Sequence, residues 1–280
     1  MEEEKQSRRH HHFVLVHGAC HGAWCWYKVV PLLKQAGYKV TALDLGASGI
    51  HPKQVTELGS VSDYHTPLME LMDSLTGDEE KVILVGHSMG GVGISAAMEK
   101  FAEKVAVAVF VAALMPAPHP GVGYSVTKEE CLKQMDFMDS QFSFHDGPEN
   151  PPTSVLFGLK AMSTKLYQLS LPEDLTLGMM LIRPCPFFND AETEAEIALT
   201  SEKYGSVPRA YVVCEADEII KPDLQRWMIE NNPTDDVKPI SSADHMAMFS
   251  KPHELCTYLL ELASKLTKIE ELCGNHDGFS

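Results

Sequence analysis

The clearest chemical motif is Gly86-His87-Ser88-Met89-Gly90, the only Gly-x-Ser-x-Gly sequence in the chain. It follows the apolar segment 81–85 and precedes a stretch rich in small residues that begins at Gly90. A strand, a tight turn and a helix form the context in which this motif exposes a serine hydroxyl at the end of a sheet. The sequence therefore predicts that Ser88 is a nucleophile.

A serine hydroxyl attacks efficiently only when a base takes its proton and a carboxylate orients that base. In folds with this motif, the acid and then the base follow the serine in chain order, each after a strand. His245 lies between the last predicted strand and the final predicted helix, so it is the predicted base. The strand at 210–214 is followed by Glu215, Asp217 and Glu218. Order alone does not choose among these acids, and spacing favours Asp217.

Backbone N–H groups must stabilise the negative charge that develops on the attacked carbonyl oxygen. One predicted donor is the N–H of Met89, which follows the nucleophile at a helix N-terminus. The second is predicted in the loop 17–20, after the first strand. His17 is expected to brace this loop, and Asp244 is expected to be structural because it adjoins His245 and cannot easily orient its ring.

The hydrophobic pattern predicts a framework that can bring these residues together. Apolar segments without polar alternation predict strands at 13–16, 39–43, 81–85, 105–114, 210–214 and 237–240. Helical spacing is found between them at 24–35, at 68–75 with Pro67 in the first turn, at 90–101, at 222–230 and after Ser250. Buried strands that alternate with helices are typical of a mostly parallel sheet covered on both faces. The predicted fold class is α/β, with six strands.

The segment 115–200 departs from this alternation, because it contains many Pro, Met and Phe residues, short helical stretches and no clear strand. A long insertion after a sheet strand is where a lid over an active site is usually built. The alternative is a helical subdomain without a catalytic role. The predicted organisation is a flexible arm at 1–12 that ends in three histidines, a core at 13–114 and 201–280, and a helical cap at 115–200.

Composition limits the classes of partner. The chain has 39 acidic and 23 basic residues, a net charge of −16, which disfavours nucleic acids and anionic membranes. Its longest apolar run, 105–115, is shorter than the roughly 18 residues that cross a bilayer, and its N-terminus has no apolar signal segment. Seven scattered cysteines suit a reducing compartment. We expect a cytoplasmic protein with a small-molecule substrate, no metal and no cofactor; whether it forms a homodimer stays open.

Several segments, in order over residues 13–267, resemble the plant methylesterase family. They are His-Gly-Ala-Cys-His-Gly-Ala-Trp at 17–24, Thr-Ala-Leu-Asp-Leu at 41–45, Ala-Ser-Gly at 47–49, Val-Ile-Leu-Val-Gly-His-Ser-Met-Gly-Gly at 82–91, Tyr-Gly-Ser-Val at 204–207 and Ala-Asp-His-Met-Ala-Met at 243–248. The family includes a salicylate-binding methylesterase, methyl jasmonate esterases and polyneuridine aldehyde esterase, and hydroxynitrile lyases are its relatives. The resemblance implies an α/β-hydrolase fold with a helical cap inserted after the fourth strand.

The resemblance also implies roles for individual residues. Ser88, Asp217 and His245 would form the catalytic triad, and the N–H groups of Ala19 and Met89 would form the oxyanion hole. Substrate contacts are implied for Ala19, His87, Phe137 and Phe142, with packing inside the cap as the alternative for the two phenylalanines. The family often has tryptophan where Phe137 stands, so this chain leaves more room beneath its cap.

The same comparison separates esterase from lyase and decarboxylase. The similar lyases have threonine at the position of Gly18, glutamate at that of His87 and lysine at that of Met246, and this chain has none of them. A related methylketone synthase, a decarboxylase, has alanine where this chain has Ser88. The sequence therefore predicts a serine carboxylesterase for methyl esters of small hydrophobic plant metabolites. The alternatives are an alkaloid-pathway esterase whose β-carbonyl acid product loses CO₂, and a ligand-binding receptor that retains the triad.

Overall fold

The computed structural model describes residues 11–75 and 81–274. Its centre is a six-stranded sheet in the order β2-β1-β3-β4-β8-β9, with every neighbouring pair parallel. The strands are β1 (His12–Val16), β2 (Lys39–Leu43), β3 (Val82–His87), β4 (Val105–Val111), β8 (Arg209–Cys214) and β9 (Asp236–Ile240). The predicted six-stranded α/β class and the order of its strands along the chain are confirmed.

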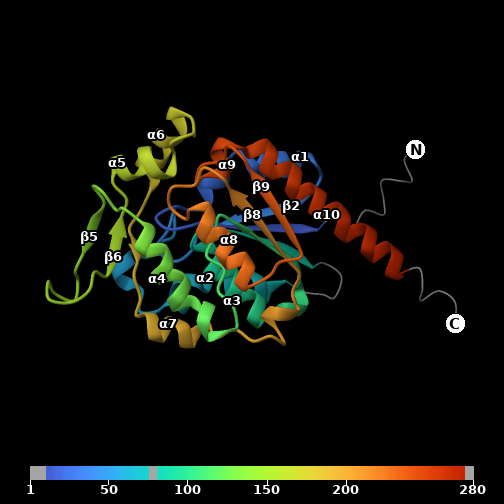
Figure 1. The fold of residues 1–280 in the computed structure, drawn as a ribbon, viewed down its shortest axis with the longest axis horizontal. Coiled ribbons are helices and arrows are strands. Elements are labelled where there is room, and N and C mark those ends of the chain that lie inside the picture. The colour runs from blue at the N-terminus through green and yellow to red at the C-terminus, as the bar shows by residue number, and fades with distance from the viewer. Residues whose placement is uncertain (1–10, 76–80, 275–280) are drawn as a thin grey trace.

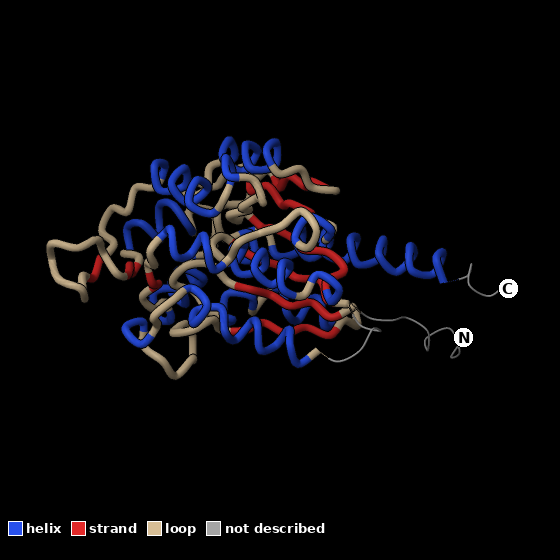
Figure 2. The backbone as a smooth tube through the Cα atoms, turned by 90° about the horizontal axis from the view of Figure 1, so that it is seen from below, coloured by secondary structure: helices blue, strands red, loops and turns tan. Residues whose placement is uncertain are grey.

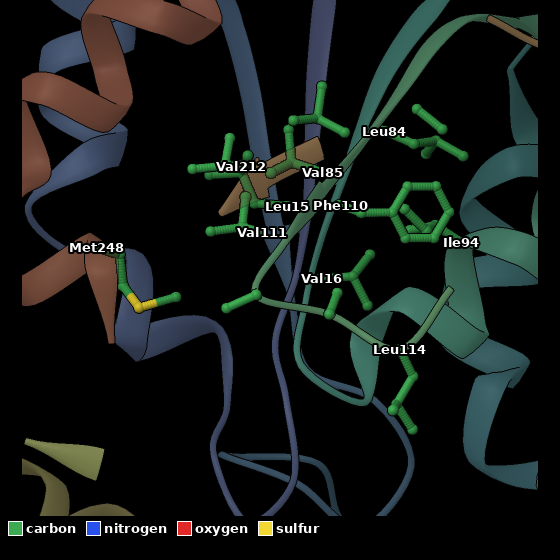
Figure 3. Close-up of a cluster of buried hydrophobic side chains, with 14 of the residues drawn as sticks. Leu15, Val16, Leu84, Val85, Ile94, Phe110, Val111, Leu114, Val212 and Met248 are labelled. Carbon is green, nitrogen blue, oxygen red and sulfur yellow. The ribbon is translucent and has the colours of Figure 1, made fainter. Parts of the chain in front are cut away.

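Helices cover both faces of this sheet (Figures 1 and 2). They are α1 (Val29–Gln35), α2 (Val61–Ser74), α3 (Gly90–Lys100), α8 (Pro222–Asn231), α9 (Ala247–Ser250) and α10 (Pro252–Gly274). Helix α1 packs against α10, and α2 packs against α3 on the opposite face. The middle strands consist almost entirely of apolar, mostly β-branched side chains, and they are buried because both faces are covered. Figure 3 shows this core, with Val85, Phe110 and Val212 contributed by three neighbouring strands.

Helix α3 packs so closely on the chain after β4 that Gly91, in its first turn, has no room for a side chain. A Cβ added at Gly91 would lie 2.1 Å from the carbonyl oxygen of Leu114. We expect Gly91→Ala to lower the free energy of unfolding by at least the roughly 1–3 kcal/mol typical of an overpacked core. Urea unfolding of this variant and of Gly205→Ala, whose added Cβ would meet its nearest atom at 3.6 Å, measures the difference. Equal free energies of unfolding for the two variants would contradict the close approach of Gly91 to the Leu114 carbonyl.

The segment between β4 and β8 lies at the carboxyl ends of the strands, on the left side of Figure 1. Its helices are α4 (Tyr124–Gln134), α5 (Leu159–Ala161), which continues as a π-helix over Met162–Leu166, α6 (Pro172–Leu181) and α7 (Asp190–Glu196). It also contains the antiparallel sheet β5 (Gln141–Ser143), β6 (Ser154–Leu156) and β7 (Cys185–Pro186). The expectation of a cap without strands is therefore wrong. Strands of two or three residues are too short to show an alternating pattern.

Two predicted helices begin or end elsewhere. Helix α2 starts at Val61, where the Ser60 hydroxyl accepts the N–H of Asp63, so Pro67 lies inside the helix rather than in its first turn. The predicted helix at 24–35 is a 3₁₀-helix, Ala23–Trp26, followed by the separate α1. Pro31 accounts for this break, because proline is accommodated in the first turn of a helix and not in its interior.

The predicted N-terminal arm, residues 1–12, extends too far towards the C-terminus. His11 and His12 are buried, and His12 is the first residue of β1, where it pairs with Lys39 and Val82. Residues 1–10 of that arm lie outside the described residues. Within 11–75 and 81–274, no helix has the length and apolarity needed to cross a membrane.

Candidate active site

Ser88 occupies the sharp turn between β3 and α3. Its φ is +54°, a left-handed conformation that is strained for a residue with a side chain and is typical of functional turns. Its carbonyl oxygen accepts the N–H groups of Gly91 and Leu114, each at 3.1 Å, which holds the turn in place. A Cβ added at Gly90 would lie 2.7 Å from the carbonyl oxygens of Val16 and His17, so the last glycine of the motif permits this packing.

The structure brings together Ser88, Asp217 and His245, which follow three different strands. The Nε2 of His245 lies 3.0 Å from the Ser88 Oγ, and its Nδ1 lies 2.8 Å from the Asp217 Oδ2. Both residues of the His245–Asp217 pair are 2% exposed. This is the geometry in which a histidine can take a proton from a serine while a carboxylate orients its ring.

The Asp217 carboxylate is fully engaged in hydrogen bonds. Its Oδ1 accepts the N–H groups of Ile219 and Ile220 at 2.7 and 3.0 Å, and the Nε2 of Gln225 lies 3.3 Å from Oδ2. The other two acids that follow β8 point elsewhere. Glu215 binds Arg226 at 2.6 Å, and Glu218 binds Lys165 at 3.3 Å. Of the three acids that order alone left open, Asp217 contacts His245.

Ala19 and Met89, whose N–H groups are the predicted oxyanion donors, border the same cavity as Ser88. Neither N–H has a hydrogen-bond acceptor within the described part of the chain. Backbone donors that are left without acceptors beside a nucleophile are suited to a carbonyl oxygen that becomes negatively charged. Ala19 and Met89 therefore lie beside the nucleophile, and their role as oxyanion donors stays a prediction.

Successive carbonyls of the loop that carries Ala19 each accept a hydrogen bond. The His17 Nδ1–H donates to the Gly18 oxygen, the His21 Nδ1–H to the Ala19 oxygen, and the Arg183 N–H to the Cys20 oxygen, at 2.7–2.9 Å. Cys20 has a φ of +63°. Because these carbonyls are fixed, the orientation of the Ala19 N–H is fixed as well. The Nε2 of His17 accepts the N–H of Leu45 at 3.1 Å, which confirms its bracing role.

Sequence reasoning missed the cap residues that support this loop. The hydroxyl of Tyr167 lies 2.7 Å from the Nε2 of His21. The guanidinium of Arg183 donates to the carbonyls of Gly49, His51 and Lys53 at 2.7–3.1 Å. In the sequence, Tyr167 and Arg183 stand out only as polar residues in a mainly apolar segment. Their partners lie more than a hundred positions away, so local sequence does not reveal the contacts.

Asp244 has the structural role expected for it, and it joins the cap to the core. Its Oδ2 accepts the N–H of Leu169 and the hydroxyl of Ser170, and its Oδ1 accepts the N–H of Met246 and the hydroxyl of Ser250. These four bonds fix the loop that carries His245.

His87 supports the same loop, since its Nε2–H donates to the His245 carbonyl at 2.8 Å. It also borders the cavity, next to Ser88. Burial lowers the pKa of His87 well below its usual value, and burial likewise lowers the pKa of His17, of His21 to about 3 and of His65 to about 4. These four histidines are therefore neutral at neutral pH.

The cavity above Ser88 lies between the strand ends and the cap. Its walls are mainly apolar and include Leu114, Val155, Phe157, Phe187, Phe188 and Ile220. Counted with its open mouth, the cavity has an empty volume of about 940 Å³.

The two cap phenylalanines implied to contact substrate differ in position. Phe137 borders the cavity, whereas Phe142 lies behind it, with its ring 5.0 Å from that of Phe137 and 37% of its surface exposed. Phe142 packs against Phe137 and Phe187, as in the alternative stated for it, and its contact with substrate stays a prediction. The sequence pattern could not show this, because the side of the cap on which Phe142 lies depends on the pairing of β5, which carries it, with β6.

One basic side chain borders the cavity, although none adjoins the triad motifs in the sequence. Lys128 of α4 forms an ion pair with Asp190 of α7 and lies 5.7 Å from the ring centres of Tyr124 and Phe187. Its charge is therefore balanced within the cap. Across the described residues, no three His, Cys, Asp or Glu side chains are arranged to hold a metal ion.

Comparisons with known proteins agree with this geometry. Residues 13–257 match the description "Alpha/beta hydrolase family". The chain is 54% identical to Methyl jasmonate esterase 1 of Vitis vinifera, over 91% of this chain and 97% of that protein. It is 45% identical to Polyneuridine aldehyde esterase of Rauvolfia serpentina, over 94% and 99%. The crystal structure of tomato Methylketone Synthase I complexed with 2-tridecanone superposes with a TM-score of 0.87 at 46% identity, over 92% of this chain and 99% of that one.

Proposed function

The chain belongs to the plant methylesterases of the alpha/beta hydrolase family, and from this premise we propose that it is a serine carboxylesterase that hydrolyses methyl esters of small hydrophobic plant metabolites. The observation that carries this proposal is the hydrogen-bonded series Ser88–His245–Asp217 at the floor of an apolar cavity. The free thiols of the described cysteines, all buried, favour the cytoplasm as its location.

The geometry supports a two-step reaction. The Ser88 Oγ attacks the ester carbonyl carbon while the His245 Nε2 takes the hydroxyl proton, and the N–H groups of Ala19 and Met89 stabilise the oxyanion. The intermediate collapses, His245 gives its proton to the leaving methoxide, and methanol departs. Water, deprotonated by His245, then attacks the acyl-enzyme, which releases the carboxylic acid and restores Ser88. Asp217 keeps the ring of His245 in position throughout. The cap at 115–200 would act as the lid that covers the acyl group.

A panel of methyl esters tests this function directly. Purified protein is incubated with aromatic, cyclic and linear methyl esters, and methanol and the free acids are measured by mass spectrometry. We expect release of methanol and acid in equal amounts, with Ser88→Ala as the inactive control. A protein that binds these esters without releasing methanol would instead support a receptor.

The similarity to Polyneuridine aldehyde esterase favours one further reaction, in which the released β-carbonyl acid loses CO₂. Such an acid decarboxylates without a metal or cofactor once the ester is cleaved, so the same triad suffices. Methyl esters with a β-carbonyl group, followed for CO₂ as well as methanol, distinguish the two outcomes.

Phe137 is expected to contribute to the choice of substrate. Phe137→Ala should raise KM for aromatic or polycyclic methyl esters by an amount equivalent to about 1–3 kcal/mol, the scale for burying one large apolar side chain. It should affect p-nitrophenyl acetate less, since that acyl group is too small to reach the cap. Phe142→Ala is the matched control, because Phe142 lies outside the cavity. Equal effects on the large and the small ester would show that Phe137 only supports the cap.

A further inference from the structure

A short segment of the cap, residues 167–170, is hydrogen-bonded to three loops that position the groups proposed for catalysis. The bonds run from Tyr167 to His21 at 2.7 Å, from Gln168 to the Ala216 carbonyl at 2.7 Å, and from Leu169 and Ser170 to Asp244 at 3.0 and 2.8 Å. His21 belongs to the loop of Ala19, and Ala216 and Asp244 directly precede the other two members of the proposed triad. One piece of the cap therefore contacts the oxyanion loop, the acid loop and the base loop.

Tyr167 is firmly held within the cap. It directly follows the π-helix Met162–Leu166, whose last residue borders the cavity. Such π-helical turns are rare and are frequently found at functional sites. The N–H of Tyr167 donates to the Met162 carbonyl at 2.9 Å, and a Cβ added at Gly178 of α6 would lie 2.9 Å from the Tyr167 hydroxyl. A shift of the cap would therefore move this hydroxyl with it.

The direction of the hydrogen bonds at His21 follows from its surroundings. The Ala19 carbonyl can only accept, so the His21 Nδ1 carries the proton in the 2.7 Å bond between them. Burial lowers the pKa of His21 to about 3, so the ring is neutral and its Nε2 is an acceptor. The Tyr167 hydroxyl therefore donates to this nitrogen. One hydrogen-bonded series runs from the cap through His21 to the Ala19 carbonyl.

Two peptide units meet at Ala19, and each is held by a different histidine. The first contains the Ala19 N–H and the Gly18 carbonyl, which accepts the His17 Nδ1–H. The second contains the Ala19 carbonyl, which accepts the His21 Nδ1–H. Rotation about the backbone bonds of Ala19 is restricted on both sides only while both carbonyls are held. Of these two histidines, His21 is the one that Tyr167 joins to the cap.

We propose that Tyr167 is a positioning residue for ester hydrolysis, which acts through His21 to keep the Ala19 N–H directed at the oxyanion of the transition state. The cap is then part of the catalytic machinery as well as a cover for the acyl group. This inference rests on the proposed methylesterase function and adds a residue of the cap to it.

Tyr167→Phe tests this role, with Tyr27→Phe as the matched control. Both rings pack on Phe249, at 5.3 and 5.8 Å, so phenylalanine keeps the packing at either position. The Tyr27 hydroxyl also joins the core to the cap, since it donates to Asp174 of α6 at 2.7 Å, but within the described chain it forms no hydrogen bond with the loop 17–20. The two variants therefore remove the same kind of bond between cap and core, and only Tyr167→Phe affects the oxyanion loop.

The kinetic constants are measured on p-nitrophenyl acetate and on the methyl esters that the wild-type protein hydrolyses. Tyr167→Phe should lower kcat by about tenfold to a hundredfold, less than the roughly 10²–10³-fold that removal of an oxyanion donor costs, because the Ala19 N–H remains but is less well oriented. KM should stay near the wild-type value, since the cavity wall is unchanged. Tyr27→Phe should leave both constants near wild type.

Inhibition by octyl trifluoromethyl ketone gives a readout that a loss of stability alone does not change. The Ser88 Oγ adds to its carbonyl carbon, His245 takes the hydroxyl proton, and the negative oxygen that results occupies the oxyanion site. Its inhibition constant should rise in Tyr167→Phe by the factor by which kcat falls. The alcohol obtained by reducing this ketone cannot form the adduct, and its binding should not change.

His21→Phe keeps a ring beside Trp24 and removes both hydrogen bonds of the series. It should cost at least as much as Tyr167→Phe, and the double variant should cost little more, because the two residues act in one series. Should Tyr167→Phe not fold, His21→Phe takes its place in the comparison with Tyr27→Phe.

Two results would overturn the inference and leave the proposed function intact: equal kcat values for Tyr167→Phe and Tyr27→Phe, or an unchanged inhibition constant of the ketone. If p-nitrophenyl acetate is hydrolysed but no methyl ester is, the proposed function fails, and the comparison on p-nitrophenyl acetate still decides the role of Tyr167. If no ester is hydrolysed, both fail.

Discussion

Ser88→Ala is expected to lower kcat for methyl-ester hydrolysis by about four to six orders of magnitude, because the attacking oxygen is removed. Binding of the ester should persist, since the apolar walls and the N–H groups of Ala19 and Met89 remain. Methanol release under single-turnover conditions and a direct binding measurement by calorimetry separate the two quantities. Retention of more than about a tenth of the wild-type activity would contradict the mechanism.

Substitutions within the triad should not have additive effects on kcat. His245→Ala is expected to cost about as much as Ser88→Ala, and the double variant little more than either, because the groups act as a unit. Glu215→Gln is the control for Asp217→Asn, since both acids follow β8 but Glu215 binds Arg226 instead of His245. Asp217→Asn should lower kcat strongly, by up to about 10⁴-fold, whereas Glu215→Gln should leave it near wild type.

Acidification below about pH 6.5 is expected to destabilise the fold. The four buried histidines His17, His21, His65 and His87 have pKa values lowered in the folded protein, while in the unfolded chain they titrate near 6.5. The unfolded chain therefore binds more protons, and the free energy of unfolding falls as pH falls. The stability that the neutral histidines contribute is present above pH 6.5 and is lost as the pH falls below it. The loss continues down to about pH 4 for His65 and about pH 3 for His21. One pH unit below 6.5, His21 and His65 each lower the free energy of unfolding by about 1.4 kcal/mol, or about 3 kcal/mol together.

Urea unfolding at neutral pH and at about pH 5.5 measures this loss. His65→Leu should reduce the dependence on pH by the share of one proton, whereas His253→Ala, at an exposed position on α10, should leave it unchanged. A free energy of unfolding that stays constant between these two pH values would show that the buried histidines do not differ between the folded and the unfolded chain.

Much of the core could be predicted from local sequence pattern. Strands β1, β3, β4 and β8 are nearly continuous apolar segments in the sequence. Such segments are typical of strands in a sheet that is covered on both faces. Parallel strands have their carboxyl ends at one edge, so residues that follow them in sequence must approach one another there. For this reason Ser88 and His245 could be named from motif and chain order, and the acid could be limited to the residues that follow β8, among which spacing favoured Asp217.

The cap was less predictable, for a physical reason. Its strands β5, β6 and β7 are two or three residues long, so they depend on pairing with one another and leave no periodic signal. The start of helix α2 was also predicted wrongly. Pro67 indicated a helix start, but the helix begins at Val61, and its residues before Pro67 that are buried are Val61, Tyr64 and His65. In both cases tertiary contacts decided the local structure.

The sequence by itself determined the fold class, the nucleophile motif and the set of acids and bases from which a triad could be built, because these depend on apolar periodicity and on residue type at short spacing. Only the tertiary structure decided that Asp217 contacts His245, that Tyr167 and Arg183 hold the loop of Ala19, and that Phe142 lies outside the cavity while His65 lies against it. These are contacts between residues far apart in the chain. They depend on how the cap packs over the sheet, and local sequence carries no record of which buried polar groups find partners there and which do not.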